Sequence, residues 1–245
     1  MKKFILLLQF LTRIPININL DVTRKDLQKS VIYFPLVGGV IGLLMYLLTY
    51  LPMDLILLSF FIVFFEILIT GGLHLDGLCD TFDGIFSNRK KEEIIEIMKD
   101  PNVGTFGALS LILLIIFKIL LIYLINLNYI YLIIMPVVSR FCVVFASKVS
   151  NYAKEKGLGN LFIEQVDIKK LLISLSFTSI IISLDYRYFL ILFINIIFTN
   201  YFVKFISKKI SGITGDTLGA IVELNEVVFL FSIYILGGIL WEKFI

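Results

Sequence analysis

The sequence predicts an all-α, polytopic membrane protein in which residues 1–245 form a single integral membrane domain. Hydrophobic residues make up 59% of the chain and charged residues 17%, whereas soluble domains average about half apolar and about a quarter charged. Mean hydropathy is correspondingly high, at +0.97. Apolar stretches of roughly 20 residues recur along the chain, and each is long enough to cross a lipid bilayer as a helix.

The expected elements are seven spans and two helices on the membrane surface. At the N-terminus, Phe4–Leu11 is too short to span and is followed by Arg13 and Pro15, so we expect an interfacial helix. No small-residue cleavage site follows it, so we do not expect a removable signal peptide. In Ser87–Pro101, isoleucines interleave with glutamates, which predicts an amphipathic surface helix that stops near the proline. The spans are expected at Val31–Leu51, Leu55–Thr70, Phe106–Ile125, Tyr129–Ala146, Leu171–Leu184, Phe189–Ile206 and a last segment ending near Trp241.

Lysine and arginine are distributed unevenly between the connections of these spans. With the N-terminus in the cytoplasm, the inner connections hold eighteen of these residues and the outer connections two, Arg187 and Lys243. Cytoplasmic loops of membrane proteins carry such an excess. The N-terminus and every stretch with candidate chemistry are therefore expected on the inner side of the cytoplasmic membrane.

Net charge and cysteine content give no indication of nucleic-acid binding, of disulfides or of a cysteine metal site. A net charge of +3 gives no basis for a nucleic-acid-binding surface. The two cysteines, Cys79 and Cys142, have neither the pattern of a disulfide framework nor the spacing of a metal site.

The segment Gly71–Gly84 carries the densest group of acidic residues at the end of an apolar run. Its aspartates, Asp76, Asp80 and Asp83, recur at spacings of four and three, which place all three carboxylates on one face of a helix. Like charges so close together need a compensating cation. A Mg²⁺ ion bound by one or two carboxylates and substrate phosphates fits this need. A solvated acidic loop is the alternative, but it leaves His74 and the regular spacing unexplained.

A second acidic stretch, Gly212–Glu226, contains Asp216, Glu223 and Glu226 at spacings of seven and three, again one helical face. Asp216 could instead cap the following helix. An acid as deep in an apolar helix as Glu223 marks a functional site. Two acidic faces on one side of the membrane suggest one pocket for one or two metal ions acting on a displacement at phosphorus. The candidate metal ligands are Asp76, Asp80, Asp83, Asp216 and Glu223.

A pocket for a polyphosphate also needs positive charges and amide donors. The candidate cations are Arg13, Arg89, Lys99, Arg140 and Lys154, and the candidate amide donors are Gly157, Gly159 and Asn160. Arg140 lies inside the fourth span, where snorkelling toward the surface is the alternative explanation.

Three further polar residues each have more than one possible role. His74 could be a general base, a hydrogen-bond partner of a metal-bound aspartate, or a polar residue near the interface. Glu66 and Lys118 lie inside adjacent spans at comparable depth. They could form one buried ion pair or part of an ion or proton path.

Six stretches of this sequence resemble the adenosylcobinamide-GDP ribazoletransferase family, also called cobalamin synthase. They occur in the expected order over almost the whole chain, and the histidine–aspartate and TGDTLGA blocks are long enough to be specific. The stretches are FLTRIP (Phe10–Pro15), FPLVGGVIG (Phe34–Gly42), GGLHLDGLCDTFDGIF (Gly71–Phe86), EIMKDPNVGTFG (Glu96–Gly107), YAKEKGLGN (Tyr152–Asn160) and TGDTLGAIVELNE (Thr214–Glu226).

The resemblance implies a membrane enzyme of the final stage of cobamide assembly. Such an enzyme joins adenosylcobinamide-GDP to α-ribazole or its 5′-phosphate, releases GMP and requires Mg²⁺. It implies metal-binding roles for Asp76, Asp80 and Asp83, and makes the second acidic stretch, with Thr217 and Glu226, the other wall of the pocket. Asp80 is expected to be essential for turnover together with His74 or another base. A homo-oligomer, or association with other corrinoid-pathway enzymes, stays open.

Two other classes of function also stay open. A cation- or proton-coupled transporter would use Glu66, Lys118 and Glu223 as a path, although transporter sites tend to lie near the membrane midplane and the densest acidic motif lies at one face. A scaffold for other membrane enzymes would leave the regular acidic spacing without a purpose. Turnover of the two substrates distinguishes the enzyme from both alternatives.

Overall fold

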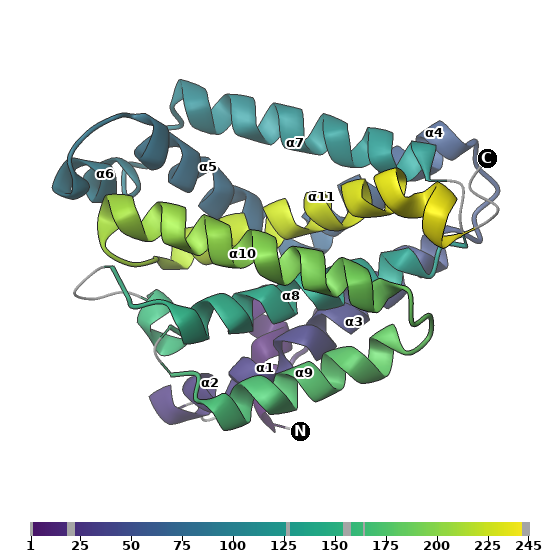
Figure 1. Cartoon of the computed structure of the whole chain (residues 1–245), viewed down its shortest axis with the longest axis horizontal. Coiled ribbons are helices and arrows are strands. Elements are labelled where there is room, and N and C mark those ends of the chain that lie inside the picture. The colour runs from purple at the N-terminus through teal and green to yellow at the C-terminus, as the bar shows by residue number, and fades with distance from the viewer. Residues whose placement is uncertain (1, 19–22, 126–127, 154–157, 164, 242–245) are drawn as a thin grey trace.

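The computed structural model describes residues 2–18, 23–125, 128–153, 158–163 and 165–241, and those residues form a bundle of helices (Figure 1). The elements are α1 (Lys2–Leu11), α2 (Arg24–Ser30), the 3₁₀ turn η1 (Val31–Tyr33), α3 (Phe34–Leu48), α4 (Leu55–Thr70), α5 (Leu73–Phe86), α6 (Lys91–Ile97), α7 (Thr105–Leu124), α8 (Tyr131–Val149), η2 (Leu158–Leu161), α9 (Ile168–Ile182), α10 (Tyr188–Ile210) and α11 (Gly215–Leu240).

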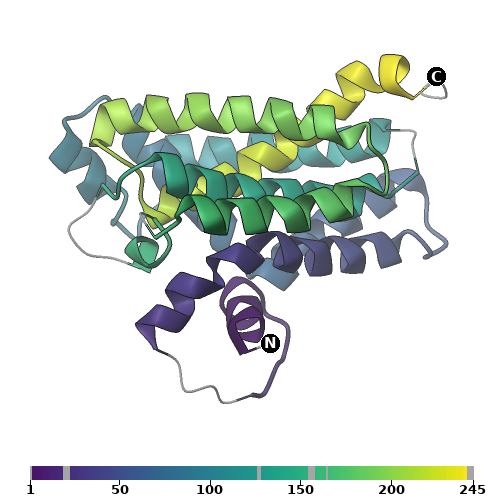
Figure 2. The same ribbon diagram turned by 60° about the horizontal axis from the view of Figure 1, so that its bottom comes forward.

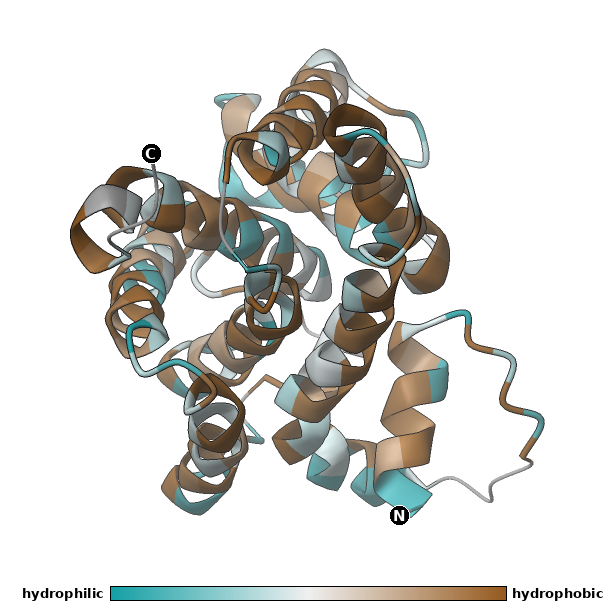
Figure 3. Ribbon diagram, turned by 90° about the vertical axis from the view of Figure 1, so that its right-hand side faces the viewer, coloured by the Kyte–Doolittle hydropathy of each residue, from teal (hydrophilic) through white to brown (hydrophobic). Residues whose placement is uncertain are grey.

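The long helices run roughly side by side, with α8 and α11 at the centre. Among the 18 most apolar consecutive residues of each helix, 78% are buried in α8 and 67% in α11, whereas 33% are buried in α7. The outer helices present apolar side chains away from the bundle, among them Leu113 and Phe193. Figure 3 looks along the helices and shows apolar residues over most of their length. This pattern, with an apolar exterior as well as an apolar core, is typical of a helical membrane protein.

Within the described residues, five helical segments are long and apolar enough to cross a membrane, and six if the bent pair α4–α5 counts as one span. The polytopic helical fold is therefore confirmed, while the number of seven crossings stays a prediction. Helices α4 and α9 occupy two of the predicted spans, but they have 16 and 15 residues. A straight 15-residue helix covers only about 22 Å of a hydrocarbon core that is about 30 Å thick.

Short helices are present at both places where membrane-surface helices were predicted, and their position at a membrane surface stays a prediction. Helix α1 lies across one side of the bundle, where Figure 2 shows it end-on beneath α3. Helix α6 has glutamates in its first turn and buries Ile94. It is shorter than the predicted segment Ser87–Pro101, because Ser87 closes the end of α5.

Two consecutive glycines change the direction of the chain between α4 and the acidic helix α5. Gly71 and Gly72 have φ angles of 64° and 70°, a left-handed conformation that glycine adopts without steric cost. The amide of Gly72 closes the end of α4 on the carbonyl of Ile67, at 3.1 Å. Helix α5 then leaves at 90° to α4, so the aspartates follow a sharp turn rather than the end of a straight span.

Close packing joins α5 to the start of α11. A Cβ atom on Gly77 would lie 2.6 Å from the carbonyl oxygen of Asp216, and one on Gly219 would lie 3.0 Å from that of His74. The first separation leaves room for glycine only and the second is a tight contact, as between small residues of packed membrane helices. The N-terminal turns of the two acidic helices therefore lie directly against each other.

Candidate active site

A cavity of about 180 Å³ opens where α5 and α11 begin. Its polar side chains are His74, Asp76 and Asp216. The rest of its wall is apolar or glycine, and comes from elements far apart in the sequence. The apolar residues are Phe10, Leu11, Phe34, Leu73, Val143, Phe162, Leu218 and Val222.

Asp216 lies in the first turn of α11 and does not form the helix cap. Thr214 is the cap: its hydroxyl accepts the amide of Thr217 at 3.2 Å, and the hydroxyl of Thr217 accepts the amide of Thr214 at 2.7 Å. The Thr214 hydroxyl also donates to Asp216 Oδ2 at 3.2 Å. Thr217, a predicted substrate ligand, is therefore buried in this capping box, and the carboxylate of Asp216 faces the cavity.

Tyr152, the first residue of the family-like stretch Tyr152–Asn160, lies near Asp216 but was not itself a predicted site residue. It pairs the loop after α8 with the segment before α11: the amide of Ala153 donates to the carbonyl of Ile213, and the amide of Ile213 donates to the carbonyl of Asn151, both at 2.9 Å. Burial, and then the negative charge of Asp216, raise the pKa of the Tyr152 phenol above its usual value.

Asp80 and Asp83 continue the acidic face of α5 beyond the cavity. Asp80 is half-buried. The two oxygens of Asp83 accept the backbone amides of Gly104 and Gly107, both at 2.8 Å, which anchors the N-terminus of α7 on a carboxylate. Each oxygen keeps a further lone pair, so the metal-binding role expected for Asp83 stays a prediction.

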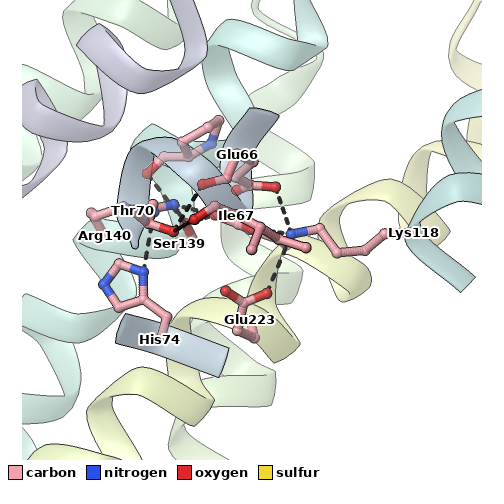
Figure 4. Close-up of polar contacts among 10 residues, drawn as sticks. Glu66, Ile67, Thr70, His74, Lys118, Ser139, Arg140 and Glu223 are labelled. Carbon is pink, nitrogen blue, oxygen red and sulfur yellow. Dashed lines mark hydrogen bonds and ion pairs between the residues drawn. The ribbon is translucent and has the colours of Figure 1, made fainter. Parts of the chain in front are cut away.

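A group of buried charges lies beside the cavity, deeper in the bundle; we call Glu66, Lys118, Arg140, Glu223 and Glu226 the buried charge cluster (Figure 4). Lys118 Nζ donates to carboxylate oxygens of Glu66 at 2.8 Å, Glu226 at 2.6 Å and Glu223 at 3.3 Å. The predicted ion pair between Glu66 and Lys118 is confirmed. Lys118 also binds two further acids, which sequence spacing did not indicate.

The structure does not bring Glu223 together with Asp76 and Asp216. Seven residues after Asp216, Glu223 does share its helical face, but it lies about 10 Å further along the axis. There it contacts Lys118 and does not line the cavity in the described part of the chain. The carboxylate that sequence spacing assigned to a metal thus neutralises a buried ammonium group.

Arg140 does not snorkel to the surface, because its side chain is 1% exposed. It forms an ion pair with Glu226 Oε1 and donates to the hydroxyl of Ser139 at 3.0 Å. Its second terminal nitrogen lies 3.4 Å from Nδ1 of His74. His74 is 5% exposed and lines the cavity, so it connects the buried charge cluster to the candidate site.

The other predicted cations lie at different places. Arg13 is exposed, packs on Gly71 and lines a surface hollow that also includes Asp76. Arg89 pairs with Glu93 on the surface at 3.8 Å, and Lys99 is exposed.

The predicted glycine-rich loop is described only in part. Gly159 lines the cavity, where a Cβ atom would lie 2.7 Å from the amide nitrogen of Gly215. Asn160 lies in η2. Lys154 and Gly157 lie outside the described residues.

The sequence did not predict the aromatic wall of the cavity, which Phe10, Phe34 and Phe162 form. The rings of Phe10 and Phe34 lie 5.7 and 5.2 Å from the ring of Phe162. Phe10 and Phe34 fall within stretches that resemble the family, which is a signal, but nothing in a single sequence brings three distant phenylalanines together.

The donors at this site fit Mg²⁺ shared with a phosphate ligand. Asp76 and Asp216 supply carboxylate oxygens, which this hard cation prefers. Among the described residues, no three acidic, histidine or cysteine side chains converge as a complete protein-made metal site. A metal held by one or two carboxylates and completed by substrate oxygens is the usual arrangement for Mg²⁺.

Comparison with known proteins places the chain in a family. The family model described as cobalamin-5-phosphate synthase matches residues 3–234. The adenosylcobinamide-GDP ribazoletransferase of Clostridioides difficile is 41% identical, covering 96% of this chain and 98% of its own length. Those of Alkaliphilus oremlandii and Caldanaerobacter subterraneus are 41% and 42% identical, covering 98% and 93% of this chain and 100% and 96% of their own lengths. No solved structure shows significant similarity. The chain therefore belongs to the cobalamin-5-phosphate synthase family.

Proposed function

We propose that this chain is an adenosylcobinamide-GDP ribazoletransferase that joins adenosylcobinamide-GDP to α-ribazole or its 5′-phosphate and releases GMP. Relatives that carry this name match nearly the full chain. The observation that carries the proposal is the cavity at which Asp76 of α5 and Asp216 of α11 meet, beside an apolar wall. Carboxylates from two helices suit a diphosphate–metal complex, and an apolar wall suits an aromatic base.

The chain's own residues bind and orient the reactants. Asp76 and Asp216 would hold Mg²⁺, which when bound offsets the charge of the diphosphate and of the departing GMP. Arg13, which shares a surface hollow with Asp76, would bind a phosphate oxygen. The apolar wall, including Phe162, excludes water and holds the base of α-ribazole so that its ribose hydroxyl faces the phosphorus. Positioning of this kind supplies much of the catalysis in phosphoryl transfer.

The placement of the site in the cell follows from the charge distribution of the sequence. The cavity lies where α11 begins, after the lysines at the end of α10. We infer that this end faces the cytoplasm, in the cytoplasmic membrane.

The test is turnover by the full chain in lipid nanodiscs. With adenosylcobinamide-GDP, α-ribazole and Mg²⁺, the protein is expected to form adenosylcobalamin and GMP in equal amounts. Asp76→Asn is expected to abolish this turnover while the protein stays folded. Asp54→Asn, at an exposed position before α4 without a side-chain cap bond, is the matched control and should keep full activity. Well-folded wild-type protein that forms no product would refute the assignment.

The buried charge cluster does contain all three residues that a transporter would use, since Lys118 contacts both Glu66 and Glu223. In that alternative, sealed vesicles containing the protein would take up a cation or protons without either substrate. We expect no such uptake, because Lys118 is held by three carboxylates and would have to leave them for a path to open.

A further inference from the structure

We infer that His74 presents its Nε2–H group to the cavity as a hydrogen-bond donor, and that Arg140 and Glu226 are positioning residues that fix this tautomer. A histidine in this state orients a ligand oxygen or ring nitrogen instead of removing a proton. The inference concerns the same cavity as the proposed function, on which its kinetic test rests. Its spectroscopic test does not depend on that function.

The hydrogen bonding of the imidazole follows from its partner. Arg140 Nη2 lies 3.4 Å from His74 Nδ1. A guanidinium group carries only donors and stays charged in proteins. Nδ1 must therefore accept this hydrogen bond through its lone pair, which leaves the ring proton on Nε2.

Arg140 is held so that it cannot turn away from His74. Glu226 Oε1 accepts from Arg140 and from Ser139, the latter at 3.1 Å, while Glu226 Oε2 accepts from Lys118 at 2.6 Å. The side chain of Glu226 is fully buried between these two cations. Its orientation, and with it that of Arg140, is consequently fixed by bonds on both carboxylate oxygens.

The other ring nitrogen of His74 points away from Arg140 (Figure 4). His74 lies in the first turn of α5 and lines the cavity together with Asp76 and Asp216. An N–H donor beside two carboxylates suits a ligand acceptor such as a phosphate oxygen, a hydroxyl oxygen or a ring nitrogen. With the lone pair of Nδ1 turned to Arg140, His74 does not take the proton of an attacking hydroxyl.

His74 is the one histidine in the 245-residue chain, so its tautomer can be read without assignment from other residues. Full-length protein without a histidine tag, labelled with ¹⁵N-histidine in nanodiscs, should give one protonated ring nitrogen, Nε2, and one bare ring nitrogen, Nδ1. A proton on Nδ1, or on both nitrogens at neutral pH, would overturn the inference. In Arg140→Lys, the charge remains for Glu226 but the second donor is lost, and both tautomers should be populated. An unchanged spectrum in that variant would remove Arg140 from the positioning role.

The kinetic test uses two amide substitutions of His74. The amide nitrogen of glutamine reaches about as far as Nε2, whereas that of asparagine reaches only as far as Nδ1. Because one hydrogen bond to a charged group is at stake, His74→Asn should lower kcat/KM by about 10- to 100-fold relative to His74→Gln. Equal and severe losses in both variants, of about 100- to 10,000-fold, would instead identify a general base. If wild-type protein shows no turnover at all, the proposed function fails, and the ¹⁵N spectrum still decides the tautomer.

Discussion

Replacing Lys118 by methionine should destabilise the protein strongly, because three buried carboxylates would lose a shared cation. The side chains of Glu66, Glu223 and Glu226 are 4%, 6% and 0% exposed, so water cannot take the place of the ammonium group. In the wild-type cluster three carboxylates share two cations, Lys118 and Arg140. In the variant the same three carboxylates would have Arg140 alone. Removing one partner of a buried ion pair costs about 3–5 kcal/mol, and methionine keeps most of the apolar stem.

Reversible unfolding of the full chain by SDS in mixed micelles would measure this free energy. Lys204→Met, at an exposed position in α10, is the matched control and should change stability by less than about 0.5 kcal/mol. The second substitution Glu66→Gln removes one uncompensated charge, so the double variant Lys118→Met/Glu66→Gln should recover at least about 1 kcal/mol. A loss of less than about 1 kcal/mol in Lys118→Met, or no recovery in the double variant, would refute the idea that Lys118 neutralises these acids.

Four further outcomes are expected. Gly77→Ala should separate α5 from α11, which should cost about 1–3 kcal/mol of stability and most of the turnover. Gly39→Ala should have little effect, because the added Cβ would meet only side chains at ordinary distance. Equal behaviour of the two variants would contradict the close contact at Gly77. Phe162→Ala should raise the KM for α-ribazole more than that for adenosylcobinamide-GDP, and the opposite order would move the base out of the aromatic wall. Chelation of Mg²⁺ by EDTA should stop turnover without unfolding the protein; undiminished turnover would exclude the metal. Burial raises the pKa of Asp185, but hydrogen bonds from Arg187 and Trp241, together with the charge of Arg187, outweigh burial and hold this pKa below its usual value. The stabilisation is therefore present above the unfolded pKa and lost as pH falls through the folded pKa. An acid unfolding profile that is identical in Asp185→Asn would contradict it.

Local sequence patterns were sufficient to predict individual helices. The bounds Leu55–Thr70 of α4 agree with the predicted second span, because an apolar run ends there at a pair of glycines. Period and charge also predicted the surface helices and the pair of Glu66 and Lys118, since adjacent antiparallel spans of similar length fix the relative depth of their residues. Each of these inferences depends on residues that are close in sequence or on consecutive helices.

Which residues form the site depends on which helices pack against each other, and a single sequence does not show this. The left-handed conformation of both Gly71 and Gly72 turns α5 by 90°, and only after that turn does Asp76 meet Asp216 from α11. The periodicity that grouped Glu223 with Asp216 was correct about the helical face, but it carries no information on which helix lies opposite each turn. At the turn of Glu223 that neighbour is α7 with Lys118.

The same reasoning applies to His74, for which the sequence left open a general base, a hydrogen-bond partner of a metal-bound aspartate and a polar residue near the interface. Beside three aspartates in the sequence, a histidine looks like a group that exchanges protons with its neighbours. In the folded chain its ring accepts a hydrogen bond from Arg140, 66 residues away, and a guanidinium group can only donate. A donor-only partner converts histidine from an acceptor of protons into a fixed N–H group. The function of this residue is therefore decided by α8, a helix whose sequence reads as an ordinary apolar span apart from its single arginine.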